Sequence, residues 1–270
     1  MRFTTTEELL QSFDGFLLDA YGVLVDSDRT LPGASAFIEE LKRRAKPFRI
    51  ISNDASTTPE AKCKKWLDRG LEIPAEALIT PWSVLSSGLG PVDVEGKKCL
   101  LIGTPLSREM LRRAGGIVAE AADPVDFLLL ADELTPDLMN VCNDAVGRLV
   151  RAFEEGLAPR LVLLNPDLVY PTSHGYGLTV GAIALMIEAA LERILGREIR
   201  FSKVGKPEPG LFELGLKELA IERSRVVMIG DQWDTDISGA SRVGMTSVLT
   251  TTGLGRPDAS RSEQLLLDGF

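Results

Sequence analysis

A short, unbroken apolar run near the start of the chain constrains its fold more than any other stretch. Residues 16–18 (Phe-Leu-Leu) lead directly to Asp19, and a glycine, Gly22, follows three residues later. An apolar run of this length, without polar alternation, is typical of a strand buried on both faces of a parallel sheet. Because ligands collect at the carboxyl ends of such strands, we expect Asp19 to lie in a functional site.

Two distant segments repeat this design. Residues 48–51 (Phe-Arg-Ile-Ile) end at Ser52, and residues 226–230 (Val-Val-Met-Ile-Gly) end at Asp231. Each reads as a buried strand that is followed by a polar residue and then by a helical pattern. The carboxyl ends of parallel strands meet at one edge of a sheet. The pattern therefore predicts that two carboxylates and a hydroxyl share one site.

The composition limits the classes of function. The chain has 270 residues, of which 44% are hydrophobic and 26% are charged, as expected for one large or two modest globular domains. A net charge of −9 and the lack of a basic stripe argue against nucleic-acid binding. No apolar stretch is long enough to span a bilayer, and the first residues lack the apolar core of a signal peptide. We therefore expect a cytoplasmic protein that binds neither nucleic acid nor membrane.

Strand and helix patterns alternate along the whole chain. The alternation over residues 81–200 is sufficient for a small α/β domain by itself, and the segments before and after it together suit a second α/β domain. We expect an α/β fold with a Rossmann-like parallel sheet core, formed by residues 1–80 and 201–270. The segment 81–200 is expected to be an inserted α/β cap domain, in which residues 171–177 form a flexible loop.

The polar residues at these strand ends suit phosphoryl transfer. Asp19 is the candidate nucleophile, since a carboxylate can take up a phosphoryl group. Ser52 can donate a hydrogen bond to phosphate, and Lys206 brings a cation to the start of a predicted helix, where the helix dipole also attracts anions. Asp231 can share Mg²⁺ with Asp19, because this ion prefers oxygen ligands, and Asp236 can brace the metal shell. Each residue alone is more typical of a turn or a helix cap than of a functional site, but the ordered set predicts one site.

This ordered set resembles the haloacid dehalogenase-like (HAD) superfamily, and the insertion resembles the C2-type cap of its class IIA members. The motifs that carry the resemblance are Asp19-Ala-Tyr21-Gly-Val, Ser52-Asn53, Gly205-Lys206-Pro207 and Gly230-Asp231 followed by Asp236. The resemblance implies a magnesium-dependent phosphatase that acts on a small phosphorylated metabolite, such as a sugar phosphate, through an aspartyl-phosphate. It also implies that two copies can pair through the cap as a homodimer.

The resemblance assigns roles to individual residues. Asp19 would be nucleophile and metal ligand, and the backbone carbonyl of Tyr21 and the Asp231 carboxylate would complete the metal site. Ser52 and Lys206 would bind the phosphate, and Asn53 would lie close to the transferring group. Further candidates for substrate binding are Asn165 and Asp167 in the cap signature, His174 as the only histidine, and Trp233 in the metal loop.

Tyr21 departs from the family's pattern. The family's phosphatases carry a second Asp at this position, which protonates the leaving oxygen and later activates water. General acid–base catalysis typically contributes about 10²–10⁴-fold, and a phenol with an ordinary pKa of about 10 is a poor base at neutral pH. We therefore expect a slow phosphatase, or one that favours aryl or acyl phosphates, or one whose cap or substrate supplies the proton. The alternative is a non-catalytic or regulatory protein that binds phosphate esters.

Overall fold

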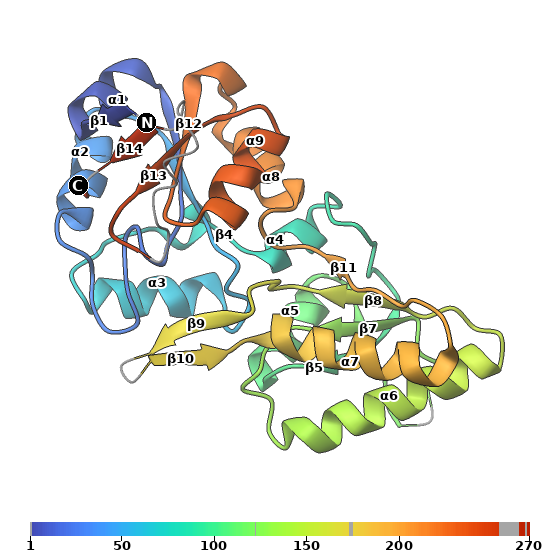
Figure 1. Ribbon diagram of the computed structural model, residues 1–270. Helices are drawn as coiled ribbons and strands as arrows, with labels where there is room; N and C mark the ends of the chain where they lie inside the picture. Colours follow the sequence, from blue (N-terminus) through green and yellow to red (C-terminus); the bar gives the residue numbers. More distant parts are fainter. Residues whose placement is uncertain (1, 122, 173–174, 254–264, 268) are drawn as a thin grey trace. The chain divides into compact units, whose positions relative to one another are not determined.

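The computed structural model describes residues 2–121, 123–172, 175–253, 265–267 and 269–270 (Figure 1). The chain divides into two compact units, and each is described by itself. The first unit comprises Met1–Ser52, Pro59–Thr80 and Lys206–Phe270, and the second comprises Asn53–Thr58 and Pro81–Gly205. We keep the prediction that the second unit is a cap domain inserted into a catalytic core.

The first unit is built on a seven-stranded sheet in which every pair of neighbouring strands is parallel. In spatial order its strands are β1 (Arg2–Thr4), β14 (Leu265–Leu267), β13 (Thr246–Thr250), β12 (Val226–Gly230), β2 (Gly15–Leu18), β3 (Phe48–Ile51) and β4 (Leu78–Ile79). Every residue of β2 and β12 is buried. The expectation of a Rossmann-like parallel α/β core is confirmed.

Helices cover both faces of this sheet, which explains why its central strands show no polar alternation. They are α1 (Thr6–Ser12), α2 (Ala34–Arg43), α3 (Pro59–Leu67), α8 (Pro209–Leu219) and α9 (Ser238–Arg242), with short helical turns at Ala75–Ala77, Arg223–Arg225 and Trp233–Ile237. Phe16 and Leu18 of β2 pack into the apolar cluster that includes side chains of α1, α2 and α3. Leu17, which points to the opposite face, lies against Gly215 of α8.

The second unit has its own five-stranded parallel sheet. In spatial order its strands are β11 (Ser202–Lys203), β8 (Arg160–Leu163), β7 (Phe127–Leu130), β5 (Lys98–Ile102) and β6 (Ile117–Val118), and its helices are α4 (Pro81–Ser86), α5 (Pro105–Arg113), α6 (Leu138–Glu154) and α7 (Val180–Leu195). Buried side chains of the central strands form one apolar cluster with those of α6 and α7. The segment therefore has a hydrophobic core of its own.

A hairpin replaces the flexible loop that the sequence predicts at residues 171–177. Strand β9 (Val169–Thr172) pairs antiparallel with β10 (Gly175–Leu178), so that prediction is wrong for the described residues. A proline in one strand and two glycines in the other hide the strand pattern, since neither residue is typical of strands. The candidate His174 lies outside the described residues.

No helix among the described residues has the length and apolar character that crossing a bilayer requires.

Candidate functional site

The sheet of the first unit brings the predicted strand-end residues to one edge. Strands β12, β2 and β3 are consecutive neighbours in the sheet. Their carboxyl ends lead directly to Asp231, Asp19 and Ser52, and all three side chains are buried. The register places Ile229 of β12 beside Leu18 of β2, and β12 continues for one more residue, so Asp231 follows one position beyond the level of Asp19.

Three carboxylates form the centre of this edge. One oxygen from each of Asp19, Asp231 and Asp236 lies within 4.8 Å of the other two, and all three residues are buried. Asp236 lies in the helical turn Trp233–Ile237 that follows β12, and its second oxygen accepts the Gln232 backbone N–H at 3.0 Å. Asp231 and Asp236, the two aspartates that follow β12, therefore both lie close to Asp19.

Lys206 is the cation of the cluster. Its Nζ lies 2.6 Å from Oδ1 of Asp19 and 2.6 Å from Oδ1 of Asp236, and its side chain is buried. Burial alone lowers the pKa of Lys206, but the two carboxylates outweigh this effect and the pKa is raised. The lysine is therefore held as an ammonium in a buried environment.

The surroundings of Asp19 favour the neutral form of its carboxyl, whereas those of Lys206 favour the charged ammonium. Burial raises the pKa of the Asp19 carboxyl well above its usual range, the neighbouring carboxylates raise it further, and the Lys206 ammonium acts against this rise. Three ionised carboxylates would outnumber the single ammonium by two charges. A donor set of buried carboxylate oxygens with this excess fits a divalent cation that prefers oxygen ligands, such as Mg²⁺.

Two glycines lie so close to the Asp231 carboxylate that neither position has room for a side chain. Gly22 adopts a left-handed conformation with φ of 81°, and a Cβ there would overlap the Asp231 carboxylate. A Cβ at Gly253 would overlap the same carboxylate. The Thr252 hydroxyl donates to the Gly22 carbonyl at 2.6 Å, which joins the loop after β13 to the turn after Asp19. These glycines form a cradle that fixes one face of the carboxylate cluster.

Tyr21 is tied to helix α3 by a residue that the sequence analysis missed. Its hydroxyl lies 3.3 Å from Nζ of Lys62, and the same ammonium lies 5.5 Å from the ring centroid. The Tyr21 ring packs against the apolar cluster of the first unit. Lys62, Cys63 and Trp66 form the buried face of α3. Lys62 lies beside Cys63 and about one helical turn before Trp66 in the sequence. This spacing could have identified Lys62 as part of the buried face of the helix.

The structure brings Asn53 together with two of the candidates from the cap signature. The Asn53 side-chain amide donates to Oδ1 of Asp167 at 3.1 Å, and the Asp167 backbone N–H donates to Oδ1 of Asn165 at 2.9 Å. All three residues belong to the second unit. Trp233, in contrast, packs against the small apolar cluster that contains Ile237. The expected role of Trp233 in substrate binding stays a prediction.

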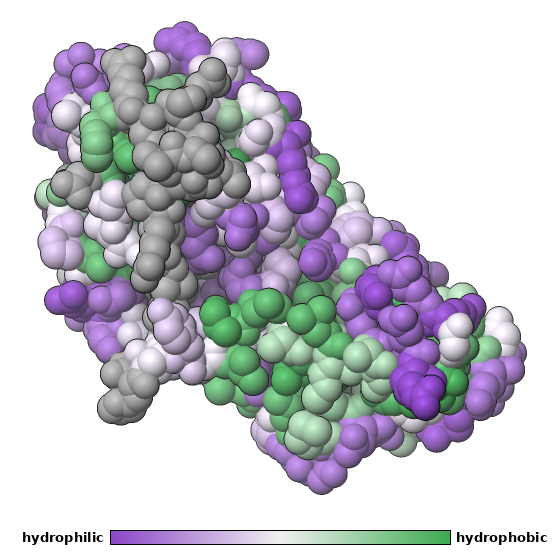
Figure 2. All heavy atoms as spheres, in the orientation of Figure 1, coloured by the Kyte–Doolittle hydropathy of each residue, from purple (hydrophilic) through white to green (hydrophobic). Residues whose placement is uncertain are grey.

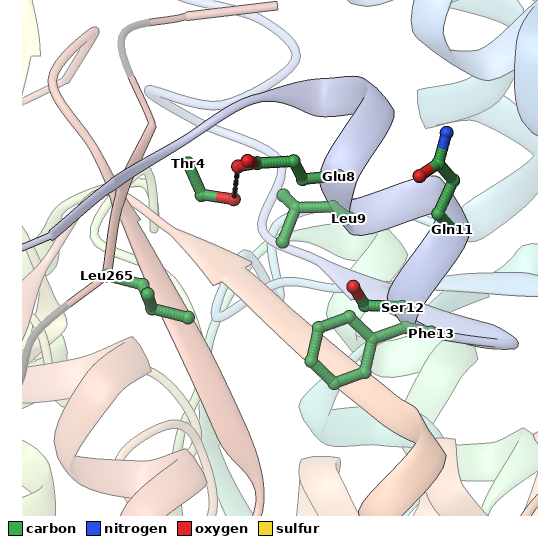
Figure 3. Close-up of a pocket in the computed structure, with 7 residues that line it drawn as sticks. All are labelled: Thr4, Glu8, Leu9, Gln11, Ser12, Phe13 and Leu265. Atoms are coloured by element: carbon green, nitrogen blue, oxygen red, sulfur yellow. Dashed lines mark hydrogen bonds between the residues drawn. The ribbon is translucent and has the colours of Figure 1, made fainter.

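A surface pocket of the first unit lies between α1 and β14 (Figure 3). It is lined by Thr4, Glu8, Leu9, Gln11, Ser12, Phe13 and Leu265, none of which is a candidate site residue. Its one charged side chain, Glu8, accepts from the Thr4 hydroxyl at 3.0 Å and from the Thr5 backbone N–H at 3.1 Å, as part of the cap of α1. The carboxylate cluster is therefore the better candidate for chemistry.

The first unit is a Rossmann-like parallel sheet with a buried carboxylate–lysine cluster at its strand ends, and the second unit lies between its segments in the chain, which defines an α/β protein with one candidate catalytic centre. Comparison with known proteins is specific about the family. A family described as haloacid dehalogenase-like hydrolase matches residues 16–116, and one described as HAD-hydrolase-like matches residues 203–266. The chain belongs to the haloacid dehalogenase-like superfamily, among its class IIA phosphatases.

Individual relatives cover most of the chain. An acid sugar phosphatase of Staphylococcus haemolyticus is 26% identical over 246 residues, which cover 91% of this chain and 88% of the relative. A dihydroxyacetone phosphatase of Corynebacterium glutamicum is 27% identical over 239 residues, which cover 88% of this chain and 81% of the relative. The structure of a possible sugar phosphatase from Cytophaga hutchinsonii superimposes with a TM-score of 0.83 at 26% identity, covering 100% of this chain and 98% of that one.

Proposed function

We propose that the chain is a magnesium-dependent phosphatase that hydrolyses a small phosphate monoester, such as a sugar phosphate, through an aspartyl-phosphate on Asp19. The observation that carries the proposal is the buried cluster in which oxygens of Asp19, Asp231 and Asp236 lie within 4.8 Å of one another. The contact of Lys206 with two of these carboxylates supports it. The relatives named as acid sugar phosphatase and dihydroxyacetone phosphatase support the class of substrate.

The residues of the cluster suit the binding of Mg²⁺. Asp19 and Asp231 would hold the ion, with Asp236 bracing the shell and the Tyr21 carbonyl as a further ligand. When bound, Mg²⁺ would neutralise negative charge on the substrate phosphate. The cradle formed by Gly22 and Gly253 would keep the Asp231 carboxylate in place.

Two displacements at phosphorus make up the proposed reaction. First, a carboxylate oxygen of Asp19 attacks phosphorus, the bond to the leaving oxygen breaks, and the electron pair stays on that oxygen. Lys206 and Ser52 bind the phosphate oxygens on which charge accumulates, with Asn53 next to Ser52 in the chain. Water then attacks phosphorus, the bond to Asp19 breaks, and the electron pair returns to the carboxylate. Each step moves one proton, which the phenol of Tyr21 is poorly suited to carry at neutral pH.

Hydrolysis of p-nitrophenyl phosphate and of a panel of sugar phosphates tests this proposal. We expect turnover with Mg²⁺, none with a chelator, and faster turnover of aryl and acyl phosphates than of sugar phosphates, because their leaving groups need little protonation. Asp231→Asn is expected to raise the Mg²⁺ concentration needed for half-maximal rate, whereas Asp234→Asn, an exposed residue of the same loop, leaves it unchanged. Magnesium-dependent binding of phosphate esters without turnover of any of them would favour the regulatory alternative.

We also propose that two copies pair through the second unit. Among the described residues, most of the exposed large apolar side chains lie in this unit. They include Leu168, Val169, Tyr170, Tyr176 and Leu178 around the hairpin and Leu185 and Met186 on α7. Figure 2 shows apolar surface over the region of the hairpin and α7. Sedimentation velocity at micromolar concentration is expected to give the mass of two chains, and Tyr176→Glu with Leu178→Glu is expected to give one; a wild-type monomer would refute the pairing.

A further inference from the structure

Two of the residues proposed to bind phosphate stand at points where the chain passes between the units. Ser52 is the last residue of the first unit before Asn53, and Lys206 follows Gly205, the last residue of the second unit. Consecutive Cα atoms across a trans peptide are only about 3.8 Å apart. Ser52 and Lys206 are therefore the covalent neighbours of Asn53 and Gly205.

Hydrogen bonds to three described residues hold Asp167, and one of these residues is Asn53. Its carboxylate accepts the Asn53 amide N–H at 3.1 Å, and its own backbone N–H donates to Asn165 Oδ1 at 2.9 Å. Its carbonyl accepts a short hydrogen bond from the Thr179 hydroxyl, at the start of α7. Both backbone groups of Asp167 are thus fixed within the second unit, so its carboxylate is presented to Asn53 from a rigid turn.

Gly205 packs against the same group of residues. A Cβ at this glycine would lie 2.7 Å from each of three atoms: Asn53 Oδ1, the Leu164 carbonyl oxygen and Pro166 Cδ. Only a residue without a side chain lets the backbone come this close. The turn 165–167 therefore contacts two residues of the second unit that border the first unit in the chain. Asp167 contacts the Asn53 side chain, and Pro166 lies against the Gly205 backbone.

We propose that Asp167 is a positioning residue of the phosphate site, which acts by holding the amide of Asn53, the residue next to Ser52 in the chain. The proposal rests on the phosphatase function proposed above. It differs from the sequence expectation that Asp167 binds substrate directly. A residue that orients Asn53 affects the transferring phosphate, which all substrates share, whereas a residue that touches the leaving group affects the choice between substrates.

Inorganic phosphate separates these two roles because it has no leaving group. We expect Asp167→Ala and Asn53→Ala each to raise the competitive inhibition constant of phosphate by about tenfold, the size typical of losing one hydrogen bond to a charged group. The double variant is expected to be no weaker than either single variant, because both changes break the same bond. The ratio of kcat/KM between p-nitrophenyl phosphate and a sugar phosphate should stay unchanged.

Two further variants keep the test interpretable if Asp167→Ala is unstable. Asp167→Asn retains a carbonyl oxygen that can accept from Asn53 and is expected to restore most of the phosphate affinity. Asp144→Ala removes an exposed carboxylate of α6 and is the matched control, with no expected effect. Thermal melting of each variant separates loss of folding from loss of affinity.

Two results would overturn the positioning role while leaving the phosphatase proposal intact. One is an unchanged phosphate inhibition constant in Asp167→Ala together with an altered preference between esters. The other is a double variant whose effect equals the product of the single effects. A wild-type protein that neither turns over esters nor binds phosphate with Mg²⁺ would instead refute the phosphatase proposal itself, and the positioning role with it.

Discussion

Asp19→Asn is expected to lower the turnover of p-nitrophenyl phosphate on the order of 10⁴-fold or more, as loss of the nucleophile does in other hydrolases. A neutral amide oxygen is a far weaker nucleophile than a carboxylate, and the substitution also removes a charge from the proposed metal site. The loss should appear in kcat at saturating Mg²⁺ and substrate. Initial rates of nitrophenol release measure it directly.

The same variant is expected to be at least as stable as the wild type when no metal is present. Asp19 is buried beside two other carboxylates, and its pKa is raised, so its ionised form is disfavoured in the folded state. Stability falls as pH rises from the ordinary carboxyl pKa through the raised one. The amide removes this cost and keeps an oxygen that can accept from Lys206. Melting temperatures in a chelator at pH 7 measure this effect.

Asp234→Asn provides the matched control, since Asp234 is an exposed aspartate of the neighbouring metal loop. It should leave both turnover and melting temperature near their wild-type values. Asp19→Asn with turnover within tenfold of the wild type would contradict the aspartyl-phosphate mechanism. A variant that lost turnover and also melted much lower would show a structural role for the carboxylate instead.

The strand-end residues could be predicted from the sequence because their signal is local. Each apolar run stops at a polar residue, and a run without polar alternation requires cover on both faces of its sheet. These two facts place Asp19, Ser52 and Asp231 at the same edge before any coordinates are known. Lys206 could be predicted from its position before a helix start, although its contact with Asp236 could not.

Other features depend on contacts between distant segments. Asn53 and Asp167 are separated by more than a hundred residues, and neither has a neighbour that indicates their pairing. Strand β14 is only three residues long and is recognisable only through its pairing with β1 on one side and β13 on the other. The packing of Trp233 against the cluster that contains Ile237 likewise depends on a contact that the sequence does not indicate.

Tyr21→Asp is expected to raise turnover of a sugar phosphate by about 10²-fold or more, within the range that general acid–base catalysis contributes. A carboxyl at this position could protonate the leaving oxygen and then accept a proton from water. The gain should be smaller for p-nitrophenyl phosphate, whose leaving group needs little protonation. The ratio of kcat/KM between the two esters therefore measures the effect without depending on the fraction of active protein.

The contact between Tyr21 and Lys62 determines how this experiment is controlled. Tyr21→Phe keeps the ring in the apolar cluster and removes only the hydroxyl that lies 3.3 Å from the Lys62 ammonium. If the phenol transfers no proton, this variant should keep turnover within a few-fold of the wild type.

A nearby ammonium stabilises an ionised carboxylate and so opposes proton donation. Lys62→Met combined with Tyr21→Asp should therefore increase the gain for sugar phosphates. No gain in either variant would mean that another group already carries the proton, and a large loss in Tyr21→Phe would identify the phenol as that group.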